Sequence, residues 1–448
     1  MKNKWYVCLM MFLPLLLSGC MMMATVEELY ALPKLPAEYQ ALSAQIESIL
    51  AHGAETTSPT SGANLQSVQL EDLDGDGEQE AIAFFRNNND ERPMKIYIFR
   101  AVDEVYEKAF VIEGSGTSIH SIRYLDMNGD GVKELLVSWR VSAQVQALSV
   151  YGLDNLQPVV LISTAYARYE ATDLDSDDVL ELVVVRSDES ETGGSLADYY
   201  DWDDMSLVLC SSARLSVTVG ELQWIQEGVL SSGERAVFLT GRVAGVEETS
   251  RAVTDILTYR DGVLSNIVLS QSTGVSSQIA RFMNLQPTDI DGDGVTEVPM
   301  PAALHTESEN DEKWKIYWFG YHANGTSIRR AITYHNLMDS WYLRIPDSWD
   351  GHFTVVQKNI SSTEHATIFY SMRGRRLGEE LLTIYTFTGE NREAQAVKGE
   401  RQILRRQPNV VYAVTYTQDY AHWRYAIEPN ELAERFSAIT SQWSTGEE

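Results

Sequence analysis

The feature that most constrains the fold of this chain is a nine-residue acidic pattern, D-x-[DN]-x-D-x-x-x-E, which occurs four times. Each copy leads directly into a run of apolar residues. Carboxylates placed this close together repel one another, whereas the apolar residues that follow favour burial. Internal repeats of this kind predict a fold built from repeated small units. The copies occupy residues 72–80, 126–134, 173–181 and 289–297.

The spacing of these acidic loops indicates five repeats. The first three copies start 54 and 47 residues apart, whereas the fourth starts 116 residues after the third, which is about two repeats. A further unit is therefore expected near the middle of that gap. The segment Glu227–Gly241 has the same turn and apolar run, with Ala236–Leu239 in the place that Ala81–Phe84 take in the first repeat. Because this segment lacks almost all of the acidic residues, the fourth of the five repeats is expected to have no metal site.

Each repeat also carries a hairpin signal after the loop. β-branched and aromatic runs interrupted by Asp, Asn and Gly predict strand–turn–strand units. With a strand on each side of the acidic loop, one repeat makes about four short strands. Tandem four-stranded units of roughly 50 residues predict a mainly β fold, a β-propeller of about five blades between residues 65 and 335. The hairpin signals lie at residues 95–110, 147–163, 199–212, 255–270 and 315–330.

The acidic loops predict calcium sites. Carboxylates at positions 1, 3 and 5, a backbone carbonyl at position 7 and Glu at position 9 would form a cage of oxygen ligands, which suits calcium. The alternative is a solvated acidic turn without an ion. If calcium binds, a structural role that stiffens the loop is favoured over calcium sensing. The candidate ligands are Asp72, Asp74, Asp76, Glu78 and Glu80; Asp126, Asn128, Asp130, Val132 and Glu134; Asp173, Asp175, Asp177, Val179 and Glu181; and Asp289, Asp291, Asp293, Val295 and Glu297.

Position 6 of the loop is where the chain is expected to turn sharply. Gly77, Gly131 and Gly294 stand there, and glycine adopts a positive φ at little cost. The third loop has Asp178 instead, a residue type that tolerates the left-handed region better than most. An EF-hand begins in a similar way, but it needs Glu at position 12 and a following helix. Position 12 is apolar in all four loops and the flanking segments predict strands, so the EF-hand interpretation fails.

These loops resemble the calcium-binding repeats of FG-GAP or VCBS type that occur in integrin-alpha-like β-propellers. The resemblance covers about residues 65–335, and the loop is its only specific motif. It implies that the side chains at positions 1, 3, 5 and 9 and the carbonyl at position 7 hold calcium. Integrin-type propellers usually have seven blades, whereas this chain has room for about five.

The N-terminus predicts a bacterial lipoprotein. Residues 1–19 read as a signal peptide, because Lys2 and Lys4 precede an apolar stretch, Trp5–Leu17, that is too short for a comfortable membrane span. The segment 17–20 resembles a lipobox in which Cys20 takes fatty-acyl groups such as palmitate; the alternative is an ordinary signal peptide. The chain is therefore expected to be lipid-anchored at the extracytoplasmic face of a bacterial membrane.

Residues 20–64 are expected to form the lipidated N-terminus, a helix and a linker. The helix is predicted over Pro36–His52, with Tyr39, Leu42, Ile46 and Ile49 on one face. Because that apolar face needs cover, packing on the propeller is favoured over a free stalk. Residues 54–64 are expected to be a polar linker.

Cysteine content and charge limit the classes of partner. Once Cys8 is removed and Cys20 is lipidated, only Cys210 remains, so no intramolecular disulfide can form; its apolar surroundings predict a buried thiol. The chain has 35 basic and 64 acidic residues, a net charge of −29. Such a surface does not attract nucleic acid or anionic lipid.

The remaining residues, 336–448, predict a small α+β domain. Strands are expected at 341–349, 352–358, 366–372, 380–387, 401–406 and 410–417, and a terminal helix at 427–443 with Leu432, Phe436, Ile439 and Trp443 on one face. The sequence contains no GxSxG, HExxH or phosphate-binding glycine loop. The favoured function is therefore binding of a protein or glycan ligand, or adhesion, at the bacterial envelope. The alternatives are a secreted carbohydrate-active or other hydrolytic enzyme and an envelope scaffold, and the oligomeric state stays open.

Overall fold

A computed structural model gives the fold of most of the chain. It describes residues 37–102, 105–154, 157–188, 194–242, 251–270, 272–274, 276, 278–281, 285–304, 313–374 and 376–439. The predicted signal peptide and Cys20 lie outside these residues. Within the described ranges, no helix has both the length and the apolar character needed to cross a bilayer. The architecture is mainly β, with six antiparallel sheets of four or five strands.

The first three sheets each contain a four-stranded meander. The first adds a short strand, β1, that pairs with the same neighbour as β2. The strands are β1 (Glu55–Thr56), β2 (Val68–Glu71), β3 (Glu80–Arg86), β4 (Met94–Val102) and β5 (Val105–Gly114); β6 (Ser118–Leu125), β7 (Glu134–Arg140), β8 (Gln146–Asp154) and β9 (Gln157–Tyr166); and β10 (Arg168–Thr172), β11 (Glu181–Ser187), β12 (Ser195–Asp203) and β13 (Ser206–Leu215).

The fourth and fifth sheets repeat this meander and add one strand each. β18 pairs with β16 in the fourth sheet, and β28 returns from far along the chain to pair with β22 in the fifth. The elements are η1 (Val219–Glu221), β14 (Leu222–Val229), β15 (Arg235–Arg242), β16 (Arg251–Arg260), β17 (Val263–Asn266) and β18 (Ile279–Arg281); and β19 (Val298–Leu304), β20 (Lys313–Tyr321), β21 (Ser327–Asn336), β22 (Trp341–Arg344) and β28 (Phe436–Ala438).

The sixth sheet has the order β23-β24-β25-β27-β26, and short helices surround it. Its elements and the remaining helices are η2 (Asp347–Trp349), β23 (Phe353–Asn359), β24 (Glu364–Arg373), β25 (Arg376–Thr388), α4 (Arg392–Ala396), β26 (Gln402–Gln407), β27 (Val410–Tyr416), α5 (Gln418–His422), α6 (Pro429–Arg435) and, at the N-terminal end of the described chain, α3 (Ala37–Ala51).

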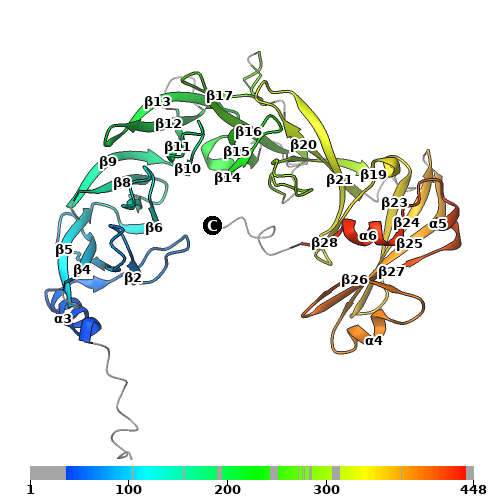
Figure 1. Ribbon diagram of the computed structural model, residues 1–448, viewed down its shortest axis with the longest axis horizontal. Coiled ribbons are helices and arrows are strands. Elements are labelled where there is room, and N and C mark those ends of the chain that lie inside the picture. The colour runs from blue at the N-terminus through cyan, green and yellow to red at the C-terminus, as the bar shows by residue number, and fades with distance from the viewer. Residues whose placement is uncertain are drawn as a thin grey trace, which may run out of the picture.

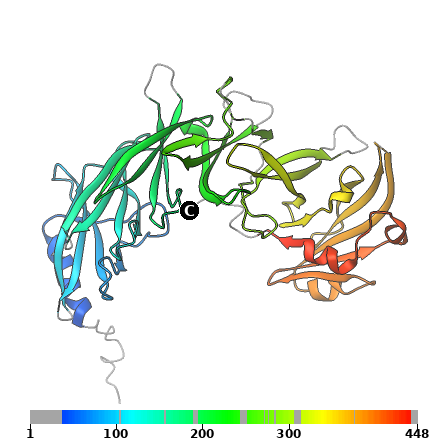
Figure 2. The ribbon, with the colours of Figure 1, turned by 45° about the horizontal axis from the view of Figure 1, so that its top comes forward.

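The sheets follow one another along an arc, with the first and sixth sheets at its opposite ends (Figures 1 and 2). Neighbouring sheets pack face to face through separate clusters of buried side chains. The second strands β3, β7, β11 and β15 are buried along nearly their whole length. This burial explains why their sequences are almost continuously apolar. A strand covered on both faces has no solvent side to carry polar residues. The predicted mainly β fold of small antiparallel sheets is confirmed.

The N-terminal helix packs on the first sheet, as its apolar face predicts. Leu42 is 5% exposed, and Tyr39, Ile46 and Ile49 pack into the same cluster with residues of β3 to β5, among them Phe85. Packing, rather than a free stalk, is therefore the observed arrangement. The helix ends where Gly53 takes a φ of +90°, which lets the chain reverse.

Residues 54–64 are not a free linker, which corrects the prediction. Glu55 and Thr56 form β1 against β3. The backbone N–H groups of Thr60 and Ser61 donate to the carbonyl of His120 in the second sheet, at 3.0 and 2.8 Å. These backbone hydrogen bonds tie the segment to the second sheet, while β1 ties it to the first.

The C-terminal part differs from its prediction in two ways. β22 is the fourth strand of the fifth sheet, so that sheet continues past residue 335. The predicted helix over 427–443 is wrong in length, because α6 ends at Arg435 and Phe436–Ala438 form β28 against β22. Phe436 therefore lies in a strand, Ile439 follows that strand outside any helix, and Trp443 lies outside the described residues.

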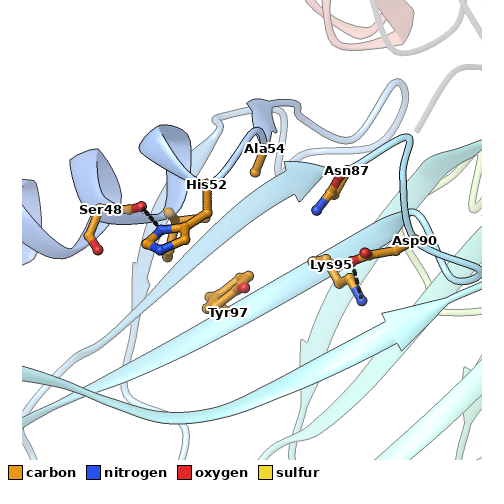
Figure 3. A pocket seen from close by; sticks show the side chains of 8 residues that line it. Ser48, His52, Ala54, Asn87, Asp90, Lys95 and Tyr97 are labelled. Atoms are coloured by element: carbon orange, nitrogen blue, oxygen red, sulfur yellow. Dashed lines mark hydrogen bonds and ion pairs between the residues drawn. The ribbon is translucent and has the colours of Figure 1, made fainter.

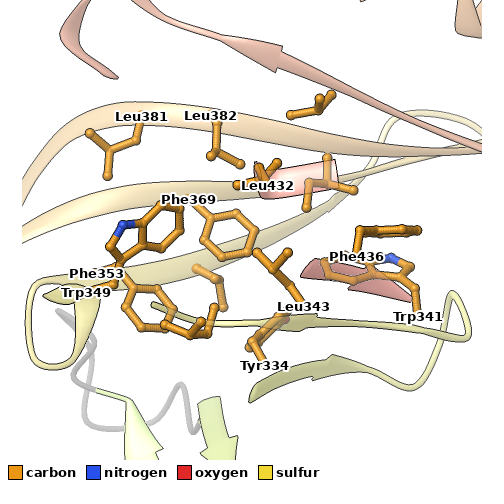
Figure 4. Close-up of a cluster of buried hydrophobic side chains, with 14 of the residues drawn as sticks. Tyr334, Trp341, Leu343, Trp349, Phe353, Phe369, Leu381, Leu382, Leu432 and Phe436 are labelled. Atoms are coloured by element: carbon orange, nitrogen blue, oxygen red, sulfur yellow. The ribbon is translucent and has the colours of Figure 1, made fainter. Parts of the chain in front are cut away.

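One aromatic-rich core joins the fifth and sixth sheets. Trp341 and Phe436 of the fifth sheet lie in the same cluster as Phe353 and Phe369 of the sixth, and Leu432 of α6 packs among them (Figure 4). This packing explains why the chain leaves its helix early. The aromatic ring of Phe436 is buried on β28, 5.4 Å from the ring of Trp341.

Cys210 is exposed rather than buried, contrary to the prediction. It lies on β13, the outermost strand of the third sheet, where part of the apolar run SLVLC faces solvent. Partial burial raises the pKa of the thiol, so the environment does not favour a reactive thiolate.

Candidate metal sites

The acidic loops occupy one equivalent place in four of the sheets. Three of them join the first strand of a sheet to the second, at β2–β3, β6–β7 and β10–β11. The fourth leads into β19, and a bridge between Thr288 and Glu297 closes its base. In the first three loops the position-9 Glu is the first residue of the buried second strand. The repeat therefore places a carboxylate at the point where the second strand of the sheet enters the core.

A network of backbone hydrogen bonds shapes every loop in the same way. In the first loop Asp72 accepts from the N–H groups of Gly75 and Gly77, at 2.8 and 3.1 Å. The other three loops repeat these two contacts. The position-5 carboxylate accepts from the backbone N–H of position 7 in all four, at 2.7 to 2.9 Å. The position-7 residues Glu78, Val132, Val179 and Val295 are thus held in the loop by their N–H groups, and the role predicted for their carbonyls as calcium ligands stays a prediction.

Positions 4 and 6 both adopt the left-handed conformation. Position 6 has φ between +69° and +90° in every loop, and this includes Asp178, as the sequence predicted. Position 4 was missed: Gly75, Gly129, Ser176 and Gly292 have φ between +68° and +85°. The sequence did carry a signal for this, because glycine stands at position 4 in three of the four loops and adopts a positive φ at little cost.

The position-9 Glu is buried in all four loops, and in three of them one of its oxygens accepts no hydrogen bond. Its Oε2 accepts from the backbone N–H of position 2 in all four loops, at 2.6 to 3.1 Å. Glu80, Glu181 and Glu297 are fully buried, and the Oε1 of each has no hydrogen-bond partner. A buried carboxylate oxygen without a partner is costly. A cation coordinated by that oxygen would remove this cost.

The pKa shifts of the loop carboxylates also favour a bound cation. Burial, and then the charges of the loop aspartates, raise the pKa of Glu80, Glu134 and Glu297 to about 7 and that of Glu181 to about 8. Burial, followed by neighbouring aspartates, also raises the pKa of Asp74, Asp175 and Asp291. A bound divalent cation would favour the ionised form of all these groups.

The loops differ in how many carboxylates they bring together. The third gathers Asp173, Asp175, Asp177 and Glu181, whose ligand atoms all lie within 4.8 Å of one another. The first and last loops gather positions 1, 3 and 9 only. In the second loop the Asn128 amide donates to Asp130 at 3.1 Å. In the last loop Asp293 is ion-paired with Arg330. The clusters of the first, third and last loops could hold a metal such as calcium.

Consecutive sites are joined by a backbone contact that the sequence did not reveal. The N–H of Lys133 in the second loop donates to the carbonyl of Leu73 in the first, at 2.8 Å. The N–H of Leu180 in the third loop donates in the same way to Met127 in the second, at 2.7 Å. Leu73 and Met127 are the position-2 residues whose own N–H groups the buried Glu holds. The first three loops therefore form a connected row across the first three sheets.

The fourth sheet has a shorter connection in place of an acidic loop. Between β14 and β15 the chain turns through Gly233, with φ +94°. Arg235 begins β15 where the other sheets have Glu, and Ala236–Leu239 are buried, as the repeat predicted. The Nε of Arg235 lies 3.9 Å from an Asp173 carboxylate oxygen in the adjacent third loop.

A separate small cavity lies between α3 and the first sheet (Figure 3). Its volume is about 240 Å³, and Lys95 and Asp90 form an ion pair of 3.1 Å at its wall. Lys95 also contacts Glu113 at 2.5 Å. The cationic group is thus already neutralised by two carboxylates. The lining residues are Ser48, Ile49, His52, Ala54, Asn87, Asp90, Lys95 and Tyr97.

No protein-family model matches the chain, and no curated protein is significantly similar to it.

Proposed function

We propose that this protein is a calcium-stabilised array of β-propeller-type blades that binds a ligand at the outer face of a bacterial membrane. In this account the first five sheets are the blades, and calcium occupies the four acidic loops. Cys20 carries the lipid anchor. The ligand is a protein or a glycan, and the rigid row of sheets is the scaffold that presents its binding surface.

The observation that carries the calcium proposal is the buried Oε1 of Glu80, Glu181 and Glu297, which accepts no hydrogen bond; at Glu297 the nearest cationic atom, Arg330 Nε, is 3.9 Å away. Three equivalent loops leave the same buried oxygen unpaired, beside two or three further carboxylates. Only oxygen atoms are offered, from side chains on a flexible loop, which suits calcium better than magnesium with its strict octahedral geometry. Ionised, closely spaced carboxylates need a counter-charge, and the ion pairs of the described residues supply it unequally: Arg330 is paired with Asp293, whereas Arg235 lies 3.9 Å from Asp173.

The proposed location is supported by the sequence of the N-terminus. Lys2, Lys4 and the short apolar stretch precede a lipobox-like segment that ends in Cys20. The net charge of −29 is compatible with a calcium-loaded extracytoplasmic protein, since four divalent ions offset part of the repulsion.

The test of the proposal has a metal arm and a ligand arm. The full chain, dialysed to equilibrium against millimolar calcium, is expected to hold calcium in excess of the dialysate, which metal analysis of both solutions detects. The calcium-loaded chain is then used to capture proteins from a bacterial envelope extract and to probe a glycan array, with the chelated chain as control. Calcium-dependent capture of a defined ligand supports the proposal. Calcium retention without any ligand in either screen would leave a structural protein and contradict the binding role.

A further inference from the structure

The third acidic loop has an additional carboxylate beside it, on the neighbouring strand. β11 and β12 pair antiparallel with Leu182 opposite Tyr200. The same register brings the next residues, Glu181 and Asp201, opposite each other. Side chains directly opposite on neighbouring strands project to the same face, with Cβ atoms about 5 Å apart. Asp201 therefore lies next to the buried Glu that closes the loop.

The equivalent position differs in every other sheet that has an acidic loop. The register of β3 with β4 puts Arg100 opposite Glu80. The corresponding registers put Gly152 opposite Glu134 and Gly320 opposite Glu297. One structural position is thus cationic beside the first loop, without a side chain beside the second and last, and anionic only beside the third.

Trp202, the residue that follows Asp201, ties this part of β12 to the third loop. The indole Nε1 of Trp202 donates to the carbonyl of Leu180, the position-8 residue of that loop, at 3.1 Å. The backbone N–H of Trp202 donates to Asp201 Oδ1 at 2.7 Å. Tyr199, on the same strand, is fully buried and its hydroxyl has no hydrogen-bond partner. Burial raises the pKa of Tyr199, and the charges of Glu181 and Asp201 raise it further, which agrees with their proximity.

Opposing positive charge is weaker here than at the last loop. Arg235 lies 3.9 Å from Asp173, and its side chain is 45% exposed. In the last loop Arg330 is directly bonded to Asp293, and its Nε lies 3.9 Å from Glu297. The third loop is also the one that gathers four carboxylates within 4.8 Å. The weaker opposing charge and the closest grouping of carboxylates therefore occur at the same loop, the third.

We propose that Asp201 supplies a fifth carboxylate to the cation site of the third acidic loop, which makes this loop the first of the four to fill. This inference rests on the proposed calcium binding. The loop sequences suggest the opposite order of filling, because the third loop lacks the glycines that the other three have at positions 4 and 6. Affinity for calcium rises with the number of charged ligands and with the rigidity of the site. Asp201 adds a charged ligand, and the contact of Trp202 with the loop adds rigidity.

Isothermal titration of the chelated full chain with calcium tests this inference. Wild type should show one site tighter than the others. Asp201→Asn, which keeps the shape of the side chain, should weaken that site by roughly tenfold, as expected for one fewer charged ligand. The control Asp204→Asn removes a charge from the exposed turn of the same hairpin and should leave the isotherm unchanged.

A gain-of-charge variant completes the design. Arg100→Asp places a carboxylate at the equivalent position beside the first loop, and a second tight site should appear. If wild type binds calcium but Asp201→Asn titrates as wild type does, the role of Asp201 is wrong while the proposed function stands. If wild type binds no calcium, the proposed function fails with it. Thermal unfolding of the Asp201→Asn, Asp204→Asn and Arg100→Asp variants in chelator verifies that each of them folds.

Discussion

At the scale of single residues, the position-9 Glu does two things at once. One oxygen holds the backbone N–H of position 2, and the other is left buried for a cation. An ionised Glu in this place is unfavourable without the ion and favourable with it. The effect of a substitution should therefore change sign with calcium, which a purely structural Glu would not show.

Glu181→Gln separates these two states. Gln can still accept from the N–H of Leu174, but it carries no charge. In chelator the variant should be at least as stable as wild type, because Gln needs neither a buried charge nor the uptake of a proton on folding. In millimolar calcium it should lose the contribution of one site, about 0.4–1.4 kcal/mol for a Kd of 10⁻⁴–10⁻³ M. Urea unfolding in both buffers measures this. Glu379→Gln, an exposed position on the sixth sheet, is the control and should change neither value.

The raised pKa of these Glu residues predicts how calcium stabilisation varies with pH. In the calcium-free fold the pKa of Glu80 is raised from 4.5 to about 7. Its protonated form therefore contributes stability that is fully present below pH 4.5 and is lost as the pH rises through about 7. Calcium binds the ionised form, so the increase in Tm on adding calcium should be larger at pH 8 than at pH 5.5. An equal increase at both pH values would contradict the assignment of Glu as a ligand.

At the scale of elements, the sequence predicted what local pattern controls. Apolar runs predicted the buried second strands, and the hairpin signals predicted β4–β5, β8–β9, β12–β13, β16–β17 and β20–β21. Contacts between distant segments were not predictable in this way. β28 pairs with β22 across about ninety residues, and this pairing ends the helix that the local pattern extended. The contact of Lys133 with Leu73 also joins separate repeats, so no single repeat encodes it.

Two glycines at the same loop position test the contact between neighbouring loops. Gly75 and Gly129 have nearly equal φ, +73° and +74°. A Cβ at Gly75 would lie 2.5 Å from the carbonyl oxygen of Gly131 in the next loop, whereas at Gly129 it would meet nothing within 4 Å. Gly129→Ala should cost about 1 kcal/mol of unfolding free energy from backbone strain alone. Gly75→Ala should cost clearly more, as measured by urea unfolding; equal costs would argue against close contact of the two loops.

At the scale of the whole molecule, the sheets are linked in series. Each sheet packs on the next through its own core cluster, and the connected acidic loops run along the same row of sheets. The aromatic core around Trp341 and Phe369 fixes the sixth sheet to the fifth. Calcium in the first three loops would therefore stiffen the junctions between the first three sheets, and because the sheets are packed in series its loss should also affect the stability of the rest of the molecule.

Anchoring by lipid is a property of the whole chain that Cys20 should control. Cys20→Ser removes the thiol that would take the acyl groups, so the variant should leave the detergent phase in a phase-separation assay of bacterial extracts. Cys210→Ser is the matched control, since that thiol is exposed but lies far from the lipobox in the sequence. Unchanged partitioning of the Cys20→Ser protein would contradict lipid anchoring at this residue.

The central claim is that calcium stabilises the row of sheets through the acidic loops. Scanning calorimetry of the full chain in millimolar calcium and in chelator tests it most directly. Each occupied site should contribute about 0.4–1.4 kcal/mol, so four independent sites together contribute a few kcal/mol. Chelation should therefore lower the Tm visibly, and magnesium should restore it poorly. An unchanged melting curve in chelator, together with no calcium in the purified protein, would show that the loops are only acidic turns.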